Sequence, residues 1–144
     1  MRRVTLLFTA MAVALMLGSG TALAALVEGN NGDNGLLGTP RADIIHAYGG
    51  DDLVSALEGR DEVHGGYGAD TLYGNRYGDT IFGGYGTDRL YGGYGDDHLI
   101  SRDLNSSGIG MRDVLDCGPG YDTFAADYDD RILGNCEEGE VSGS

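Results

Sequence analysis

The chain has 144 residues, which is about the size of one domain, and its 9 basic and 23 acidic residues give a net charge of −14. It contains no lysine. This balance excludes nucleic acids and anionic membranes as partners, because both require a basic face. With 27 glycines and no tryptophan we expect no large conventional core, and a compact form of this charge would repel itself unless cations neutralise it.

The first 24 residues have the layout of a secretory signal peptide. Arg2 and Arg3 precede an apolar run over residues 4–17, and Ala22-Leu23-Ala24 is a small-x-small cleavage signal. A membrane anchor is the alternative, but the run is shorter than the roughly 20 residues of a spanning helix. We predict cleavage after Ala24, a secreted, extracellular protein with no membrane span after cleavage, and a mature charge of −16 from 7 basic and 23 acidic residues.

Residues 29–100 divide without a gap into eight rows of nine residues, whose positions we call columns one to nine. Glycine fills columns one and four in six of the eight rows each, and column eight is always aliphatic. A disordered glycine-rich segment has no reason to keep this phase from Gly29 to Ile100. Column six holds Asn34, Asp43, Asp52, Asp61, Asp70, Asp79, Asp88 and Asp97.

The columns predict a short repeated unit of turn and strand. Columns one to six are turn-like, because glycine permits positive φ and close backbone approach. Columns seven to nine are strand-like, with column eight facing opposite to its neighbours. Such a short strand cannot bury its aliphatic residue alone, so we expect the copies to stack as a solenoid.

The rows resemble the nonapeptide G-G-x-G-x-D-x-U-x of RTX calcium-binding proteins, with U aliphatic. Rows 65–73, 83–91 and 92–100 match this pattern in full, and row 74–82 keeps Gly74, Asp79 and Ile81. The resemblance implies an all-β, right-handed parallel β-roll in which two rows make one turn, so that each residue neighbours its counterpart two rows away. RTX toxins and proteases are large and carry a separate active domain, so this chain would be a small secreted form.

On the geometry that the resemblance implies, the column-six side chains form two stacks, one along each edge of the roll. Stacked carboxylates repel one another, and a divalent cation between them reverses that interaction. Calcium suits a purely oxygen donor set, because it takes six to eight oxygens in flexible geometry. The expected ligands are Asp43, Asp52, Asp61, Asp70, Asp79, Asp88 and Asp97, with backbone carbonyls near Gly65, Tyr67, Gly83, Tyr85, Gly92 and Tyr94.

Three gaps on each edge predict about six calcium ions. The best sites should lie between Asp70 and Asp88 and between Asp79 and Asp97. The gap facing Asn34 should be the weakest, and rows 29–64 are degenerate, with Ala47, Ala56 and Arg41 at glycine positions. We further predict that the calcium-free chain is largely unfolded, because separated turns offer no site before they stack.

After Ile100 the phase breaks over "SRDLNSS" and resumes in rows 108–116 and 117–125, which place Asp113 and Asp122 in column six as less certain ligands. These rows either continue the roll or form a separate closing element. Residues 126–144 are expected to cap the last apolar layer. The domain organisation is thus a signal peptide over 1–24, a roll over 25–100, and a loop, two weaker repeats and a cap over 101–144.

Cys117 and Cys136 are the only cysteines, and an even count in an exported protein predicts one disulfide, which would pin the cap. Two thiols in a metal site are the alternative. Asp127, Asp129 and Asp130 are interpreted as solvated rather than as an acid and base pair.

Other chemistry has little support in the sequence. H-E-x-x-H and G-x-S-x-G are both absent, so we predict that the protein is not an enzyme. His46 and His64 should stack on one outer face, with a transition-metal site as the alternative. Column nine also places Tyr73 with Tyr91, and Phe82 with Ile100, on the outer faces. Such ladders suggest an adhesion module that binds a cell-surface glycan, cell-wall polymer or protein, unless the tail or a second copy covers them.

Overall fold

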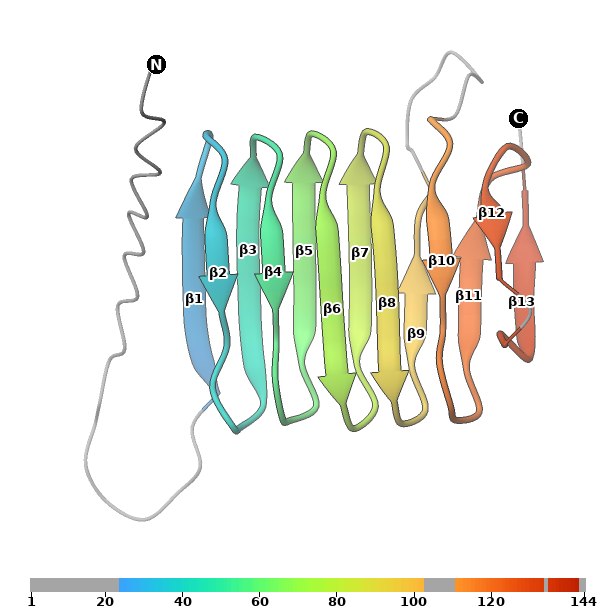
Figure 1. Cartoon of the computed structure of the whole chain (residues 1–144), viewed down its shortest axis with the longest axis horizontal. Coiled ribbons are helices and arrows are strands. Elements are labelled where there is room, and N and C mark those ends of the chain that lie inside the picture. Colours follow the sequence, from blue (N-terminus) through green and yellow to red (C-terminus); the bar gives the residue numbers. More distant parts are fainter. Residues whose placement is uncertain (1–23, 103–110, 134, 143–144) are drawn as a thin grey trace, which may run out of the picture.

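A computed structural model describes residues 24–102, 111–133 and 135–142, and within these ranges the chain is an all-β parallel solenoid. Successive strands alternate between two sheets, ordered β1-β3-β5-β7-β9-β11-β13 and β12-β10-β8-β6-β4-β2, which lie back to back (Figure 1). The strands are β1 (Ala25–Asn30), β2 (Gly35–Leu37), β3 (Asp43–Gly49), β4 (Leu53–Ser55), β5 (Glu62–Tyr67), β6 (Thr71–Arg76), β7 (Thr80–Tyr85), β8 (Arg89–Tyr94), β9 (His98–Ile100), β10 (Val114–Asp116), β11 (Thr123–Ala126), β12 (Arg131–Ile132) and β13 (Glu138–Val141). The predicted fold class is confirmed.

The register between turns follows the period of the rows. Val54 pairs with Leu72, its counterpart two rows later, and the same offset recurs throughout the strands from β1 to β9. From β8 to β10 the offset is longer, with Leu90 opposite Leu115. The two weaker rows therefore continue the roll, and the extra residues after Ile100 are absorbed before β10.

The strands are longer than the columns predict. Strands β5 to β8 run from column seven through to column three, so that only columns four to six form the turn. In the six rows from Ala47 to Ile100, column two has φ between 77° and 112°, yet Gly66 still pairs with Gly84. A positive φ therefore bends these strands without ending them, and the expectation that columns one to six all form the turn is wrong for β5 to β8. Strands β2, β4, β9 and β10 span columns seven to nine alone, as expected.

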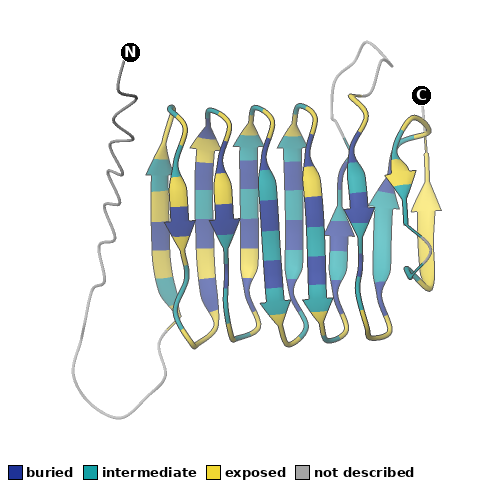
Figure 2. Cartoon of the chain, in the orientation of Figure 1, coloured by how far each residue is buried: buried dark blue, intermediate teal, exposed yellow. Residues whose placement is uncertain are grey.

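The core is a narrow column of buried side chains between the two sheets, and it runs along the solenoid axis. Columns six, eight and one point inward, and Figure 2 shows the resulting buried bands across the strands. The fully buried column-eight side chains are Ile45, Val54, Val63, Leu72, Ile81, Leu90, Leu99 and Leu115. Each contributes roughly 1.5–3 kcal/mol by burial, so the stack of turns supplies the core that no single row has.

The C-terminal end of the roll is closed by β12, β13 and a disulfide. Cys117 and Cys136 are bonded, as predicted, and both belong to or contact the last apolar layer. In the part of the chain that the structure describes, no helix is long and apolar enough to cross a membrane. The proposed signal peptide lies almost wholly outside the described residues.

Candidate metal site along the turns

Two stacks of aspartates follow the edges of the roll, where the turns join the two sheets. Every aspartate of column six from Asp43 to Asp122 is at most 3% exposed. Its Oδ1 accepts a hydrogen bond from the backbone N–H of the column-six residue one turn earlier. Asp70 accepts from Asp52 at 2.9 Å, and Asp79 accepts from Asp61 at 2.8 Å. One carboxylate oxygen of each aspartate thus holds the turns together.

The second carboxylate oxygen has a different environment. In six of these aspartates the Oδ2 atom is buried and makes no hydrogen bond, namely in Asp52, Asp61, Asp70, Asp79, Asp97 and Asp122. A buried carboxylate oxygen without a partner costs free energy, and a whole row of them requires protons or cations.

The column-one glycines allow these oxygens to approach the backbone closely, because no Cβ is present. A Cβ added to Gly65 would collide with Oδ2 of Asp70 and with the carbonyl oxygen of Gly83 in the next turn. A Cβ on Gly74 would meet Oδ2 of Asp79 and the carbonyl oxygen of Gly92 in the same way. We call this arrangement of a glycine, its own aspartate Oδ2 and the next turn's carbonyl a cradle. It brings together the predicted carboxylates with the predicted carbonyls of Gly83 and Gly92.

Burial disfavours the charged form of these aspartates. Burial and, to a smaller extent, the neighbouring charges of Asp61 and Asp97 raise the pKa of Asp79 to about 8, against the lowering effect of the hydrogen bond from the Asp61 backbone. Burial likewise raises the pKa of Asp52 and Asp97 to about 6. The metal-free edges therefore hold protons close to neutral pH, in positions that a cation would take over.

Comparison with known families decides which cation this arrangement suits. A family model of four copies of the RTX calcium-binding nonapeptide repeat matches residues 28–63 and again 64–99. The chain belongs to this family. A search of curated proteins finds no match. RTX repeats bind calcium, which agrees with the all-oxygen donor set of the cradles.

Among the described residues no three carboxylate, imidazole or thiolate side chains converge as a metal site. The described turns instead place carboxylate oxygens beside backbone carbonyls, as in the cradles. Two of the other predicted carbonyls already accept hydrogen bonds. The carbonyls of Tyr67 and Tyr85 accept from the backbone N–H groups of Gly50 and Gly68 one turn earlier, both at 2.9 Å. Gly65 and Tyr94 occupy the equivalent columns of their rows.

The first RTX rows are less open. Asp43 accepts hydrogen bonds from the backbone and hydroxyl of Thr39, so both of its oxygens are already engaged. The Oδ1 of Asn34 accepts from Asn30 at 2.7 Å. Ala47 and Ala56 carry a methyl group where the cradles have none. These contacts agree with the expectation that rows 29–64 are degenerate.

The structure also shows two acidic residues that the sequence interpretation missed. Asp130 Oδ1 accepts from the backbone of Asp113 at 3.0 Å, and Glu137 Oε2 accepts from the backbone of Asp122 at 2.8 Å. They end the two aspartate stacks. Asp130 also binds Ser101 Oγ, so the interpretation of this residue as solvated is wrong. Their sequence separations from these donors, 17 and 15, are close to the 18 of the regular turns, and this likeness is the signal that was available.

The outer ladders form as expected. The rings of His46 and His64 stack with centroids 4.7 Å apart, and those of Tyr73 and Tyr91 also stack at 4.7 Å. His64 Nε2 lies 2.7 Å from Glu62 Oε1. Even with Glu62 beside His64, no three such side chains within the described ranges form a group that could hold a metal ion, so the transition-metal alternative gains no support.

Proposed function

We propose that this is a secreted calcium-binding protein in which several calcium ions, about six, lie between successive RTX turns. The observation that carries this proposal is the cradle, where a buried Oδ2 without a hydrogen bond faces a backbone carbonyl of the next turn. The predicted aspartates from Asp52 to Asp97 act as ligands, with Asp113 and Asp122 continuing the two stacks. Asp43, the remaining predicted ligand, would first have to release its hydrogen bonds with Thr39. Catalysis forms no part of this function.

Each group in the turn has a separate role. The Oδ1 atom fixes the distance between turns through its backbone hydrogen bond, while Oδ2 is left for the ion. The column-one glycine keeps the space open, and the next turn contributes its carbonyl. Calcium supplies two positive charges at each gap, which offset the repulsion between aspartates that are stacked along a strongly acidic protein.

Binding and folding are coupled in this proposal. The two halves of a cradle come from one row and from the second row after it, so the site does not exist until the turns stack. At neutral pH the charge on the buried carboxylates opposes stacking. The chain is therefore largely unfolded without calcium and forms the roll as the ions bind.

A calcium titration of the purified protein followed by far-UV circular dichroism and calorimetry tests this. We expect a rise in β-structure and binding of several ions. Asp79→Asn keeps the oxygen that bonds to Asp61 but removes the charge, and should lose at least one ion. Asp51→Asn is the matched control, because Asp51 lies in column five, is exposed and also accepts backbone hydrogen bonds.

Two outcomes would contradict the proposal. One is an unchanged spectrum and no binding heat from zero to millimolar calcium. The other is equal loss of ions in Asp79→Asn and Asp51→Asn, which would indicate diffuse attraction to the acidic surface rather than binding in the gaps.

A groove on the seven-stranded sheet favours a second function, the binding of a cell-surface glycan. It has a volume of about 270 Å³ and is floored by Gly66 and Gly84. The His46 and His64 rings line one side, and Tyr67 and Tyr85, stacked at 5.0 Å, line the other. The Tyr67 ring is 66% exposed, and its partner in the preceding turn is Gly49, which has no side chain to stack on it. A sugar ring could stack on this exposed ring.

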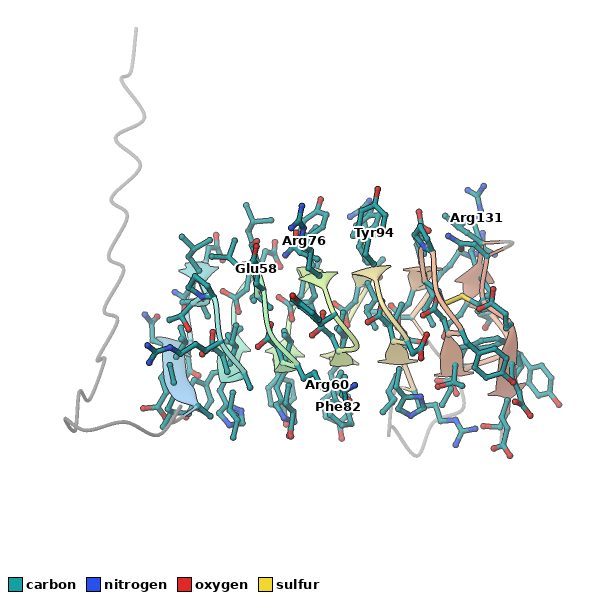
Figure 3. The ribbon with its side chains drawn as sticks, turned by 90° about the horizontal axis from the view of Figure 1, so that it is seen from below. Glu58, Arg60, Arg76, Phe82, Tyr94 and Arg131 are labelled. Carbon is teal, nitrogen blue, oxygen red and sulfur yellow. A yellow bond between two sulfur atoms is a disulfide. The ribbon has the colours of Figure 1, made fainter. Side chains whose placement is uncertain are left out.

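Pull-down with cell-wall polysaccharide, with and without chelator, tests the second function. Tyr67→Ser should abolish retention, whereas Tyr94→Ser should not, since Tyr94 is equally exposed but lies on the face opposite to Phe82 and the groove (Figure 3). Equal retention of the two variants would exclude this groove as the binding surface.

A further inference from the structure

The disulfide lies at the last gap of one aspartate stack, beyond the residues that match the family. A Cβ on Gly92 would collide with Oδ2 of Asp97 and with the carbonyl oxygen of Cys117. This is the same cradle as at Gly65 and Gly74, with a cysteine carbonyl in place of a glycine carbonyl. The Cys117 carbonyl accepts a hydrogen bond from the backbone N–H of Gly93 at 2.9 Å, and its second lone pair is the one available to an ion. The next carboxylate follows the same pattern, because Asp122 Oδ1 accepts from the Asp97 backbone at 2.8 Å.

The other cysteine is tied to the carboxylate side of this gap. Cys136 directly precedes Glu137, whose Oε2 accepts from the Asp122 backbone at 2.8 Å. In return the Asp122 carbonyl accepts from the backbone N–H of Glu137 at 3.1 Å. The bond between Cys117 and Cys136 thus joins the residue that offers the carbonyl to the segment that orients Asp122 (Figure 3).

We infer that Asp97, Asp122 and the Cys117 carbonyl form a terminal calcium site that the disulfide holds in place. This inference rests on the proposed function, and it adds an ion outside the matched repeats together with a redox dependence confined to it. Cys117 and Glu137 are positioning residues for the site. Cys117 also supplies its backbone carbonyl as a ligand.

The need for a covalent tie follows from the position in the stack. An interior turn is held by neighbours on both sides, whereas the turn of Asp122 has a full repeat on one side only. Elements at the end of a solenoid open more easily than those inside it. A disulfide with a sequence separation of 19 restricts that opening, so the cradle at Gly92 stays assembled at calcium concentrations where an untied terminal turn would separate.

The opposite edge lacks this tie. Its stack ends at Asp130, which is held by the Ser101 hydroxyl at 2.7 Å and by the Asp127 backbone at 2.8 Å. Both contacts are hydrogen bonds within the cap. Reduction of the disulfide is therefore expected to act on the edge of Asp97 and Asp122.

The test counts bound calcium by native mass spectrometry and calorimetry on the oxidised protein, the reduced protein and the double variant Cys117→Ser/Cys136→Ser. We expect both disulfide-free forms to lose one ion, or to bind it at least tenfold more weakly, while the remaining ions are unchanged. Asp122→Asn should lose the same ion with the disulfide intact, because Asp122 contributes to this gap alone among the aspartate gaps. Reduction of Asp122→Asn should then remove no further ion.

Glu137→Gln keeps the bond to the Asp122 backbone and the disulfide, so it should retain the terminal ion better than Cys117→Ser/Cys136→Ser. An unchanged ion count after reduction would overturn the inference, as would loss of all ions together. Loss of a further ion when Asp122→Asn is reduced would place the redox effect elsewhere. If the oxidised protein binds no calcium at all, the proposed function itself fails, which is a distinguishable result.

Discussion

At the residue scale, the decisive feature is the absence of a side chain at the column-one glycines. Gly65, Gly74 and Gly92 leave room for an aspartate oxygen and a carbonyl oxygen to approach the same point. Ala47 and Ala56 carry a methyl at the corresponding position of their rows. A single methyl group therefore decides how closely the two oxygens can approach the backbone of that row.

Gly74→Ala should weaken calcium binding at one gap by at least tenfold, which corresponds to about 1.4 kcal/mol. The added methyl would collide with Asp79 Oδ2 and the Gly92 carbonyl, so the donors must move apart. Calorimetry should resolve the lost site. Gly32→Ala is the control, because its added Cβ would meet only the flexible side chain of Asn30 at 3.4 Å. Equal binding by the two variants would contradict the role given to column one.

Tyr77 is one of two residues in column four of rows 29–100 that are not glycine, the other being Arg41. Its φ is 74°, a left-handed conformation that costs a tyrosine of order 1 kcal/mol or more. Its side chain is 60% exposed, so little burial is lost on removal. Tyr77→Gly should raise the free energy of unfolding in saturating calcium by up to about 1 kcal/mol.

Denaturant unfolding of Tyr77→Gly against Tyr94→Gly separates strain from side-chain loss. Tyr94 is similarly exposed but has no positive φ, so the glycine variant at that position should be destabilised. A loss of stability in Tyr77→Gly would show that the tyrosine ring contributes more than its backbone strain costs.

At the element scale, the strands depend on the neighbouring turns for both pairing and core. Leu90 of β8 is fully buried between Leu72 and Leu115 of the adjacent turns. Strand β4 shows the contrast, since Val54 is fully buried and Leu53 is 54% exposed. Alternation along such short strands decides which side chains stabilise the roll.

Leu90→Ala should lower the free energy of unfolding by about 2–5 kcal/mol, because the side chain leaves a cavity between two turns. Leu53→Ala should change it by less than about 0.5 kcal/mol, as is usual for exposed positions. Chemical denaturation in calcium gives both values. A similar decrease in the free energy of unfolding in the two variants would mean that the column of buried side chains does not dominate stability.

The sequence was sufficient to predict the elements that follow the phase of the rows. The two-row register came from the resemblance to RTX repeats. Given that register, the buried column eight, the stacked His46 and His64 and the disulfide depend on the phase or on residue type. Strand length was not predictable in this way, because glycine at column two indicates a turn whereas the structure keeps pairing through it. Asp130 and Glu137 were not predicted as the last members of the stacks for another reason, because their spacings from Asp113 and Asp122 differ from the regular spacing of one turn.

At the scale of the whole molecule, charge opposes the fold unless protons or calcium offset it. The pKa of Asp79 is raised by burial to about 8, and those of Asp52, Asp61 and Asp97 to about 6. In the unfolded chain these groups titrate near 3.8. The folded, metal-free roll thus binds more protons than the unfolded chain between about pH 4 and pH 8.

Because the folded pKa values lie above the unfolded one, metal-free stability is greatest below about pH 4 and falls as the pH rises through 6 to 8. In chelator, acidification from pH 8 to pH 5 should therefore increase β-structure by circular dichroism. With calcium present the same acidification should weaken binding, because protons compete for Oδ2. Loss of β-structure on acidification in chelator would contradict the sign of these shifts.

The aspartate stacks have a direction, since each backbone N–H donates to a carboxylate of the following turn and two different acids, Asp130 and Glu137, receive the last donors. Each acid serves one edge, and only one edge carries the disulfide. Deletion of a single row would exchange the two edges, so that each aspartate stack would end at the acid that now serves the other stack. Deletion of two successive rows would leave each stack with its own terminal acid. The unit that can be gained or lost in this protein is therefore one full turn of two rows. Shorter or longer relatives should differ by whole turns.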